Sequence, residues 1–265
     1  MSAALLSALM LAAPLGACAR KMAPTSQAAD ATPPSGEEDY RPEPELSKAA
    51  RQPGGRLELI GNADARSAVR LSSVAGAAQF TRADAHGEWR LSIAASPMPR
   101  LFGLAMSDKG RVVQAMGYLF VAPDGTVARL RAGGGSQIVA TTASVAALPA
   151  LDYDNQFASV VSGRAAPGQT VSLAVDGVQR GQAAAGVSGR FVLPLNQPLT
   201  AGPHEFDLAT AGGETRLAAD VDAPAKLGRA LFAASRTPAG WRVDWVTPGG
   251  GEQTTLVFLR AEPAA

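Results

Sequence analysis

Apolar and polar residues alternate in short segments along the chain from Leu57 onward. The segments Glu88–Ile93 and Thr170–Val175 show the pattern clearly, with every second residue apolar. This period of two is typical of β-strands that bury one face. Asp176-Gly177 separates two such segments and is a strong hairpin signal. The pattern therefore predicts an all-β protein.

The alternation occurs twice, with the two copies 102 positions apart in the sequence. The matched positions keep register without a gap: Gly61 with Gly163, Val69 with Val171, Leu71 with Leu173, Gly87 with Gly189, Trp89 with Phe191 and Leu91 with Leu193. Such self-similarity indicates a duplicated structural unit. We expect both units to share one topology, with the residues at the Trp89 and Phe191 positions pointing inward.

Each unit is followed by residues that predict a β-hairpin. Pro123-Asp124-Gly125 is a turn between two β-rich runs, and Gly240–Phe258 alternates on both sides of a Gly-rich loop. Trp241, Val243 and Trp245 share one face of that second hairpin, so we expect Arg242 and Asp244 to face solvent. The segments Gly133–Gln137 and Gly249–Gln253 resemble each other. Either the duplication extends to the hairpins, or the two loops merely share a turn composition.

The predicted fold is all-β: two immunoglobulin-like β-sandwich units in tandem, each followed by a β-hairpin, after a disordered N-terminal tether. The predicted boundaries are a signal peptide at 1–17, a tether at 18–55, a first unit at 56–140, a linker at 141–156 and a second unit at 157–262. The tether is assigned because its prolines and mixed charges cannot bury enough apolar surface to fold.

The second unit carries a family resemblance. The segments that carry it are Ser162–Val171, Val175-Asp176-Gly177, Gly189-Arg190-Phe191 and Leu199–His204. They resemble bacterial immunoglobulin-like repeats, well over about residues 158–223 and more loosely over 56–122. The resemblance implies a β-sandwich of a kind common in envelope and surface proteins. It says nothing about a ligand, because sandwiches host many unrelated functions.

The N-terminal residues predict export and lipidation. The apolar run Ala3–Leu15 is too short to span a bilayer and suits the apolar region of a secretory signal. Leu15-Gly16-Ala17-Cys18 resembles the lipobox of bacterial lipoproteins, which implies a lipid on Cys18 and membrane attachment through it. Ala19 after the cysteine implies the outer membrane, with a periplasmic or surface-facing position. Met1-Ser2 lacks the usual positive charge, and an ordinary secretory signal with a chance cysteine is the alternative.

Composition excludes several classes of function. Lys and Arg total 24 against 23 Asp and Glu, a net charge of +1, so nucleic acid is not an expected partner. The single cysteine excludes a disulfide framework within the chain. The only histidines, His86 and His204, lie in turn-rich segments, and no Cys or His cluster of metal-binding spacing exists.

Two weaker signals leave open alternatives. Asp152, Asp154 and Asn155 offer oxygen ligands for calcium, although few for an ion that takes 6–8, and a solvated turn is favoured. Gly249–Thr255 superficially resembles a phosphate loop but lacks the lysine and the following helix. We therefore expect no cofactor and no metal.

The sequence thus predicts a non-enzymatic, lipid-anchored envelope protein that serves as a structural or interaction module, with envelope proteins or glycans as partners. One alternative is a carbohydrate-binding module in which Trp241 and Trp245 form an exposed stacking platform. We favour core packing for both, since each alternates with charged residues. An enzyme with an unfamiliar site is the remaining alternative, although no acid, base and nucleophile cluster in the sequence.

Overall fold

The computed structural model describes residues 41–140, 149–260 and 262–263, and these form antiparallel strands joined by turns, with a single turn of 3-10 helix (η2, Pro53–Gly55). The strands of the first repeat are β1 (Glu45–Arg51), β2 (Leu57–Asn62), β3 (Ala68–Ser73), β4 (Ala78–Arg82), β5 (Glu88–Ile93), β6 (Arg100–Asp108), β7 (Arg111–Gln114), β8 (Tyr118–Val121), β9 (Val127–Leu130) and β10 (Gln137–Ala140). Among the described residues, no helix is long and apolar enough to cross a membrane.

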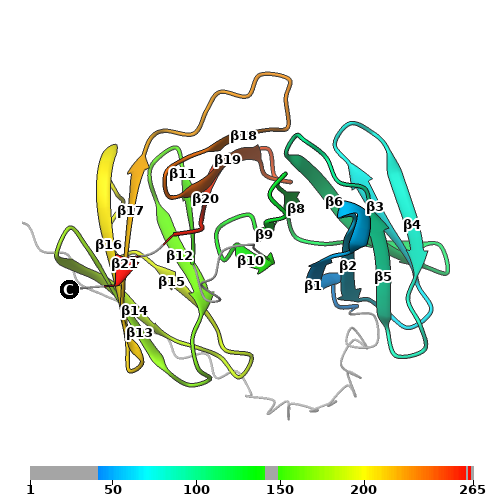
Figure 1. Ribbon diagram of the computed structural model, residues 1–265, viewed down its shortest axis with the longest axis horizontal. Coiled ribbons are helices and arrows are strands. Elements are labelled where there is room, and N and C mark those ends of the chain that lie inside the picture. The colour runs from blue at the N-terminus through cyan, green and yellow to red at the C-terminus, as the bar shows by residue number, and fades with distance from the viewer. Residues whose placement is uncertain (1–40, 141–148, 261, 264–265) are drawn as a thin grey trace, which may run out of the picture. The chain divides into compact units, whose positions relative to one another are not determined.

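The second repeat continues the same pattern (Figure 1). Its strands are β11 (Ala150–Asp154), β12 (Ser159–Arg164), β13 (Thr170–Val175), β14 (Val178–Ala184), β15 (Arg190–Pro194), β16 (Gly202–Thr210), β17 (Gly213–Val221), β18 (Phe232–Arg236), β19 (Gly240–Val246), β20 (Glu252–Phe258) and β21 (Glu262–Pro263). The predicted signal peptide and the predicted lipidation site Cys18 lie outside the described residues.

Four sheets make up the two sandwiches. In the first repeat the strand orders are β1-β2-β5 and β10-β9-β8-β6-β3-β4, with β7 also pairing β6. In the second repeat they are β15-β12-β11-β20-β19-β18 and β14-β13-β16-β17-β21. The order β5-β2-β1 therefore recurs as β15-β12-β11, and β4-β3-β6 recurs as β14-β13-β16. This confirms the all-β, immunoglobulin-like fold and the 102-residue duplication.

The duplication holds at the level of individual side chains. Gly61 pairs with Trp89, and Gly163 pairs with Phe191. A Cβ atom on Gly61 would lie 2.4 Å from Cζ2 of Trp89, and one on Gly163 would lie 3.0 Å from Cε1 of Phe191. In both repeats, therefore, the glycine leaves room for an aromatic ring from the neighbouring strand. Trp89 and Phe191 are both buried, as predicted.

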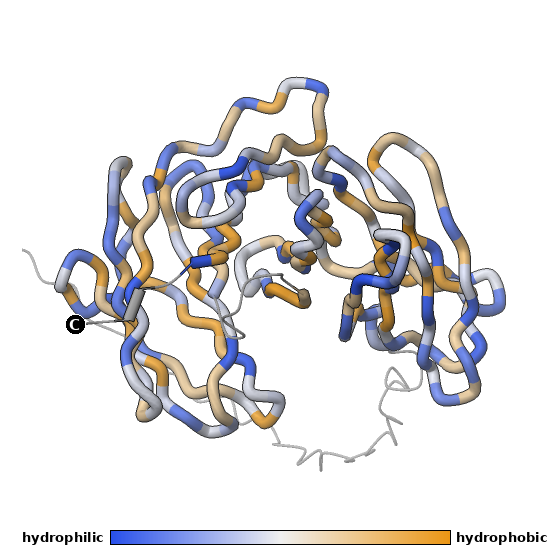
Figure 2. The backbone as a smooth tube through the Cα atoms, in the orientation of Figure 1, coloured by the Kyte–Doolittle hydropathy of each residue, from blue (hydrophilic) through white to orange (hydrophobic). Residues whose placement is uncertain are grey.

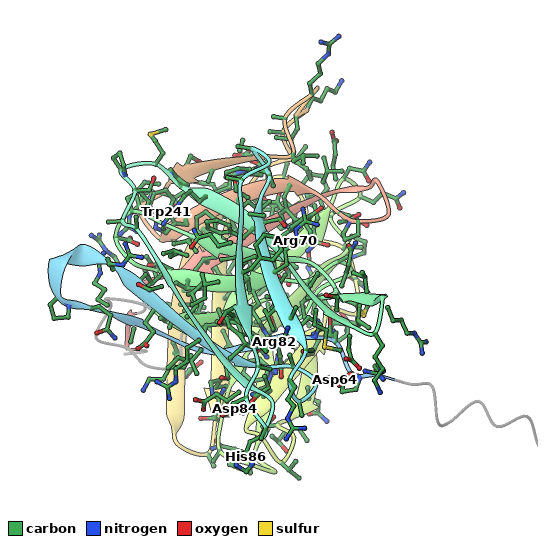
Figure 3. All side chains as sticks on the ribbon, turned by 90° about the vertical axis from the view of Figure 1, so that its right-hand side faces the viewer. Asp64, Arg70, Arg82, Asp84, His86 and Trp241 are labelled. Carbon is green, nitrogen blue, oxygen red and sulfur yellow. The ribbon has the colours of Figure 1, made fainter. Side chains whose placement is uncertain are left out.

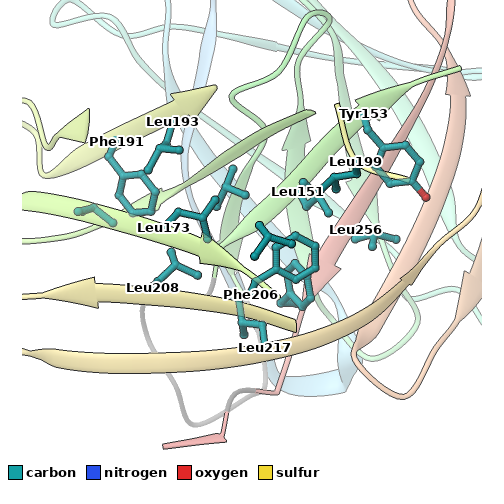
Figure 4. Close-up of a cluster of buried hydrophobic side chains, with 14 of the residues drawn as sticks. Leu151, Tyr153, Leu173, Phe191, Leu193, Leu199, Phe206, Leu208, Leu217 and Leu256 are labelled. Atoms are coloured by element: carbon teal, nitrogen blue, oxygen red, sulfur yellow. The ribbon is translucent and has the colours of Figure 1, made fainter. Parts of the chain in front are cut away.

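Each repeat has its own apolar core between its sheets. Figure 4 shows the core of the second repeat, where Leu193 of one sheet packs with Leu173 and Phe206 of the facing sheet. Leu59, Leu71 and Trp89 occupy the corresponding place in the first repeat. The colouring of Figure 2 alternates along many of these strands, because one side chain points to the core and the next to solvent.

The predicted hairpins are three-stranded and belong to the sheets. β8, β9 and β10 pair in order, as do β18, β19 and β20, and β20 continues the second repeat's sheet by pairing with β11. The two Gly-rich loops each precede the third strand. Both repeats therefore carry a three-stranded meander at the same place in the chain, but the first joins its sheet through β8 and β6 and the second through β20 and β11.

Two predicted boundaries were wrong. Glu45–Arg51, assigned to the disordered tether 18–55, forms β1 and pairs along β2. Leu46 and Ala49 are buried in this strand. The sequence did not reveal it because these few apolar residues lie among prolines and charged residues. Ala150–Asp154, assigned to the linker 141–156, forms β11 between β12 and β20. The first repeat thus begins before residue 56 and the second before residue 157.

Candidate interaction site

The two repeats differ where the meander (β8–β10 in the first repeat, β18–β20 in the second) lies beside the edge of the sheet that contains β6 or β16. We call this place in each repeat the seam. In the first repeat β8 pairs with β6 over Arg100–Phe102, so the meander continues the sheet that contains β6, β3 and β4. In the second repeat β17 occupies that edge, because it pairs with β16 along its whole length. β18 consequently has only β19 as a partner. Figure 1 draws β17 and β18 as separate edges, joined by a long loop.

A cavity of about 730 Å³ lies at this seam. Its apolar wall includes Trp241, Leu256 and Phe258, which belong to strands β19 and β20. The remaining lining is small or polar and comes chiefly from β16, β17 and the turn after β18; it includes Pro203, His204, Glu205, Ala218, Ala219, Asp220, Asp222, Ser235, Arg236 and Arg242. A volume of this size is typical of sites that take small ligands or short chain segments.

His204 is held on the cavity wall by two partners. Its Nδ1 lies 2.6 Å from Oδ2 of Asp176, and its Nε2 lies 2.9 Å from the carbonyl oxygen of Thr200. The backbone N–H of Glu205 and the His204 ring together hold the pKa of Asp176 below its usual value. Both ring nitrogens of His204 are therefore engaged in fixing the turn, which agrees with the structural role favoured by its sequence context.

Arg242 and Asp244 do not face solvent, contrary to the prediction. The two side chains form an ion pair at 2.9 Å, and Thr254 donates a 2.5 Å hydrogen bond to Asp244. Arg242 also donates to the hydroxyl of Tyr153 and to the carbonyls of Asp222 and Ala223. The segment after β17 therefore covers this face of β19. Burial opposes the charge of Arg242, but Asp244 outweighs it and raises the Arg242 pKa.

Trp241 and Trp245 are buried, with exposed fractions of 9% and 0%. The indole N–H of Trp241 donates to Asp124 at 2.9 Å, and that of Trp245 donates to Thr255 at 3.0 Å. The rings pack against Phe120 and Tyr118 of the first repeat. Neither ring is free to stack on a sugar, so their burial favours the core interpretation over the platform required by the carbohydrate alternative.

Asp152 is bound by protein groups on all sides, which differs from the calcium alternative. Its carboxylate accepts hydrogen bonds from the N–H and hydroxyl of Ser136, from Gln253 and from Thr255, at 2.6–3.2 Å. Asp154 instead caps a turn by accepting from the N–H groups of Gln156 and Ala158, and Asn155 is exposed. No group of three candidate ligands capable of holding a metal exists in the described part of the chain.

The other two candidates from the sequence, His86 and the loop that begins Gly249–Thr255, lie in turns. Asp84 accepts from the backbone N–H groups of His86 and Glu88, which places His86 in an exposed turn. Figure 3 labels Asp84 and His86 together at one end of the view, well apart from Trp241. The loop at Gly249–Gly251 closes through hydrogen bonds to Thr247 and leads into strand β20 rather than a helix, so it lacks the architecture of a phosphate loop.

No family model matches the sequence, and no curated protein matches it. Three solved structures show low similarity. The first, "Biofilm associated protein - BSP domain", is 13% identical, covers 68% of this chain and 30% of its own, and has a TM-score of 0.24. The second, "Central Fibronectin-III array of RIM-binding protein", is 9% identical, covers 83% of this chain and 90% of its own, and has a TM-score of 0.27. The third concerns host cell surface retention of a 1.5-MDa bacterial ice-binding adhesin; it is 14% identical, covers 77% of this chain and 80% of its own, and has a TM-score of 0.21. This chain thus spans less than a third of the first. At these scores, we transfer none of their functions to it.

Sequence reasoning missed the cavity. The signal for it is the length of β17, whose nine residues replace the short β7 of the first repeat. That difference lies outside the stretch where the two copies keep register, so the self-comparison does not display it.

Proposed function

We propose that this chain is a lipid-anchored protein of the bacterial cell envelope whose two immunoglobulin-like sandwiches act together as one non-enzymatic structural and interaction module. The observation that carries the proposal is the cluster formed by both meanders. Leu101, Phe120 and Leu130 of the first repeat pack with Trp241 and Trp245 of the second in a single buried group. A chain of independent domains would not share a core.

Polar contacts also join the repeats. The loop after β9 enters the second repeat, where Ser136 binds Asp152 and Gly133 donates its N–H to Gln253. Glu45 of β1 accepts hydrogen bonds from Arg129 and from Arg190 of β15. Directional bonds of this kind fix one arrangement of packed elements, because a buried polar group left without a partner is costly. They support a rigid module rather than flexible beads.

The envelope location rests on the N-terminal sequence. Leu15-Gly16-Ala17-Cys18 combines small residues before a cysteine with a preceding apolar run, and this cysteine is unique in the chain. Several acyl chains, each contributing about 0.8 kcal/mol per buried CH₂, hold a protein firmly on a membrane. Residues 19–40 contain prolines and charged residues and precede the first residues that the structure describes. Outer-membrane attachment follows from the same motif, through Ala19.

Cys18→Ser tests the anchor, with Ser35→Ala as a control in the same segment. In a bacterial host fed a palmitate analogue, we expect the parent and the control to incorporate label and to fractionate with membranes. The Cys18→Ser variant should do neither. Ala19→Asp should keep the label but move the protein to the inner membrane. Equal membrane attachment of the parent and the Cys18→Ser variant overturns the proposed anchor.

A further inference from the structure

We propose that the open seam of the second repeat binds an extended, basic peptide segment of a partner protein, which adds a strand to the free edge of β17. This inference gives the proposed interaction role a site and so rests on that role. The two repeats differ here: β8, which closes the edge of β6, is itself paired with β9, whereas β17, which closes the edge of β16, has no strand partner over Leu217–Val221 within the described residues.

The backbone of β17 presents unpaired hydrogen-bonding groups at the cavity. The main-chain N–H and C=O of Glu205 both point away from β17. The N–H donates to the Asp176 carboxylate, and the carbonyl accepts a hydrogen bond from the Asp176 N–H. Glu205 lies opposite Ala218. In an antiparallel pair of this kind, the N–H and C=O of both residues point away from each other. Those of Ala218 therefore point outward.

Neighbouring pairs agree with this assignment. Asp220 lies opposite Pro203, which has no N–H to donate, and has the same outward parity as Ala218. The existing strand β21 pairs only with Thr215 and Arg216 of β17. Among the described residues, the main-chain N–H and C=O groups of Ala218 and Asp220 thus have no strand partner. An extended peptide that pairs with such an edge is an established mode of recognition.

The cavity lining favours this mode over binding of a compact ligand. Ala218, Ala219 and Asp220 are consecutive, and all three line the cavity. Successive residues of a strand point to opposite faces, so a cavity that meets three in a row meets the edge of the strand. The short side chains of the two alanines leave that edge accessible.

Charge selects a basic occupant. The two arginines of the lining are already paired, Arg236 with Asp124 and Arg242 with Asp244, each at 2.9 Å. Asp220 forms no ion pair within the described residues, and Asp222 lies 3.8 Å from Arg242 with its side chain 73% exposed. Negative charge therefore predominates beside the free edge. Lysine or arginine side chains on the added strand would meet both carboxylates.

The test uses the purified full-length chain carrying Cys18→Ser and a fluorescent heptapeptide of alternating valine and lysine with blocked ends. Fluorescence anisotropy should show saturable binding, and the corresponding valine–glutamate peptide should bind at least about tenfold more weakly. Replacement of both Asp220 and Asp222 by Asn should reduce this discrimination. Absence of saturation up to about 1 mM lysine peptide overturns the proposal, as does equal binding of the acidic peptide.

Ala218→Pro tests the edge itself. Proline removes an outward N–H while leaving the ladder to β16 intact, so the fold should persist, as checked by circular dichroism and melting. We expect affinity to fall about fivefold or more, whereas Ala218→Val should bind within about twofold of the parent. Equal affinities of the Pro and Val variants overturn the proposal. If the Pro variant misfolds, a peptide N-methylated along its pairing edge replaces it, and undiminished binding of that peptide has the same meaning.

A second copy of this chain is the competing occupant. It would produce a dimer in solution that Ala218→Pro dissociates, and that result overturns the peptide assignment. These measurements do not depend on lipidation, so their failure is distinguishable from failure of the Cys18 experiment.

Discussion

At the scale of single residues, the repeat is recognisable because a glycine faces an aromatic ring. An added Cβ at Gly61 would also lie 2.0 Å from the carbonyl oxygen of Glu45, a backbone atom that cannot move without β1. At Gly163 the nearest atoms are the edge of the Phe191 ring, at 3.0 Å. The same pairing of glycine and aromatic residue therefore tolerates an added side chain better in the second repeat than in the first.

Substitution of these glycines measures that difference. Gly61→Ala should lower the free energy of unfolding by about 3 kcal/mol, and Gly163→Ala by about 1 kcal/mol, because only the second site can relax by ring movement. Gly103→Ala is the control, since a Cβ there meets nothing within 4 Å. Denaturant titration provides the measurement. Equal losses at Gly61 and Gly103 would contradict the steric explanation.

Asp152 shows the opposite kind of residue, one whose role is invisible in sequence. Burial raises its pKa, although hydrogen bonds from Ser136, Thr255 and Gln253 act against this. The folded state then holds the proton more tightly than the unfolded state, whose pKa is about 3.9. The contribution of Asp152 to stability is complete below that value and declines as pH rises through the folded pKa.

The Asp152→Asn variant isolates this effect. The free energy of unfolding of the parent minus that of the variant, measured across a pH series, should fall as pH rises above about 4, because other titrating groups cancel. A difference that increases over this range would show that the four hydrogen bonds dominate over burial and that the Asp152 pKa is lowered instead.

At the scale of elements, alternation identified most strands, and it failed where both faces of a strand are covered. β19 was predicted to bury Trp241, Val243 and Trp245 and to expose Arg242 and Asp244. The tryptophans are buried, but against the first repeat rather than within the second. The opposite face is covered by the chain after β17, a contact between distant segments that no local pattern encodes.

Truncation of β19 residues should therefore destabilise from both faces. Trp245→Ala should cost about 3–5 kcal/mol through lost packing. Arg242→Ala should cost about 3 kcal/mol, because it leaves Asp244 buried without its partner. Thermal unfolding should show both losses, while Arg229→Ala, at an exposed loop position, should change stability little. An unchanged melting temperature for Arg242→Ala would restore the solvent-facing assignment.

At the scale of the whole molecule, the sequence predicted two similar units but not that they pack against each other through a shared buried cluster. The repeat signal reports what the copies share, whereas their union depends on where they differ. Ser136 and Asp152 illustrate this: each was assigned to a loop or linker, yet they bond to each other across the two repeats. The open seam arises similarly, because β17 is long where β7 is short. Pairwise geometry of this kind is absent from any single segment.

A shared core has a consequence for unfolding. Phe120 is fully buried in the cluster that joins the repeats and contacts Trp241. Loss of its ring weakens the contact between the repeats, whereas loss of Phe191 weakens only the core of the second repeat. Both substitutions remove similar apolar volume and should each cost about 3–5 kcal/mol. They should differ in the cooperativity of unfolding that remains.

Calorimetry distinguishes the two cases. The parent should unfold in one transition, with equal calorimetric and van't Hoff enthalpies. Phe120→Ala should broaden this transition or split it into two, since each repeat keeps its own core while their coupling is reduced. Phe191→Ala should lower the melting temperature of the second repeat, and through the intact contact that of the whole, without splitting. A parent that already melts in two independent transitions would mean that the shared cluster contributes little coupling and that the repeats act as separate domains.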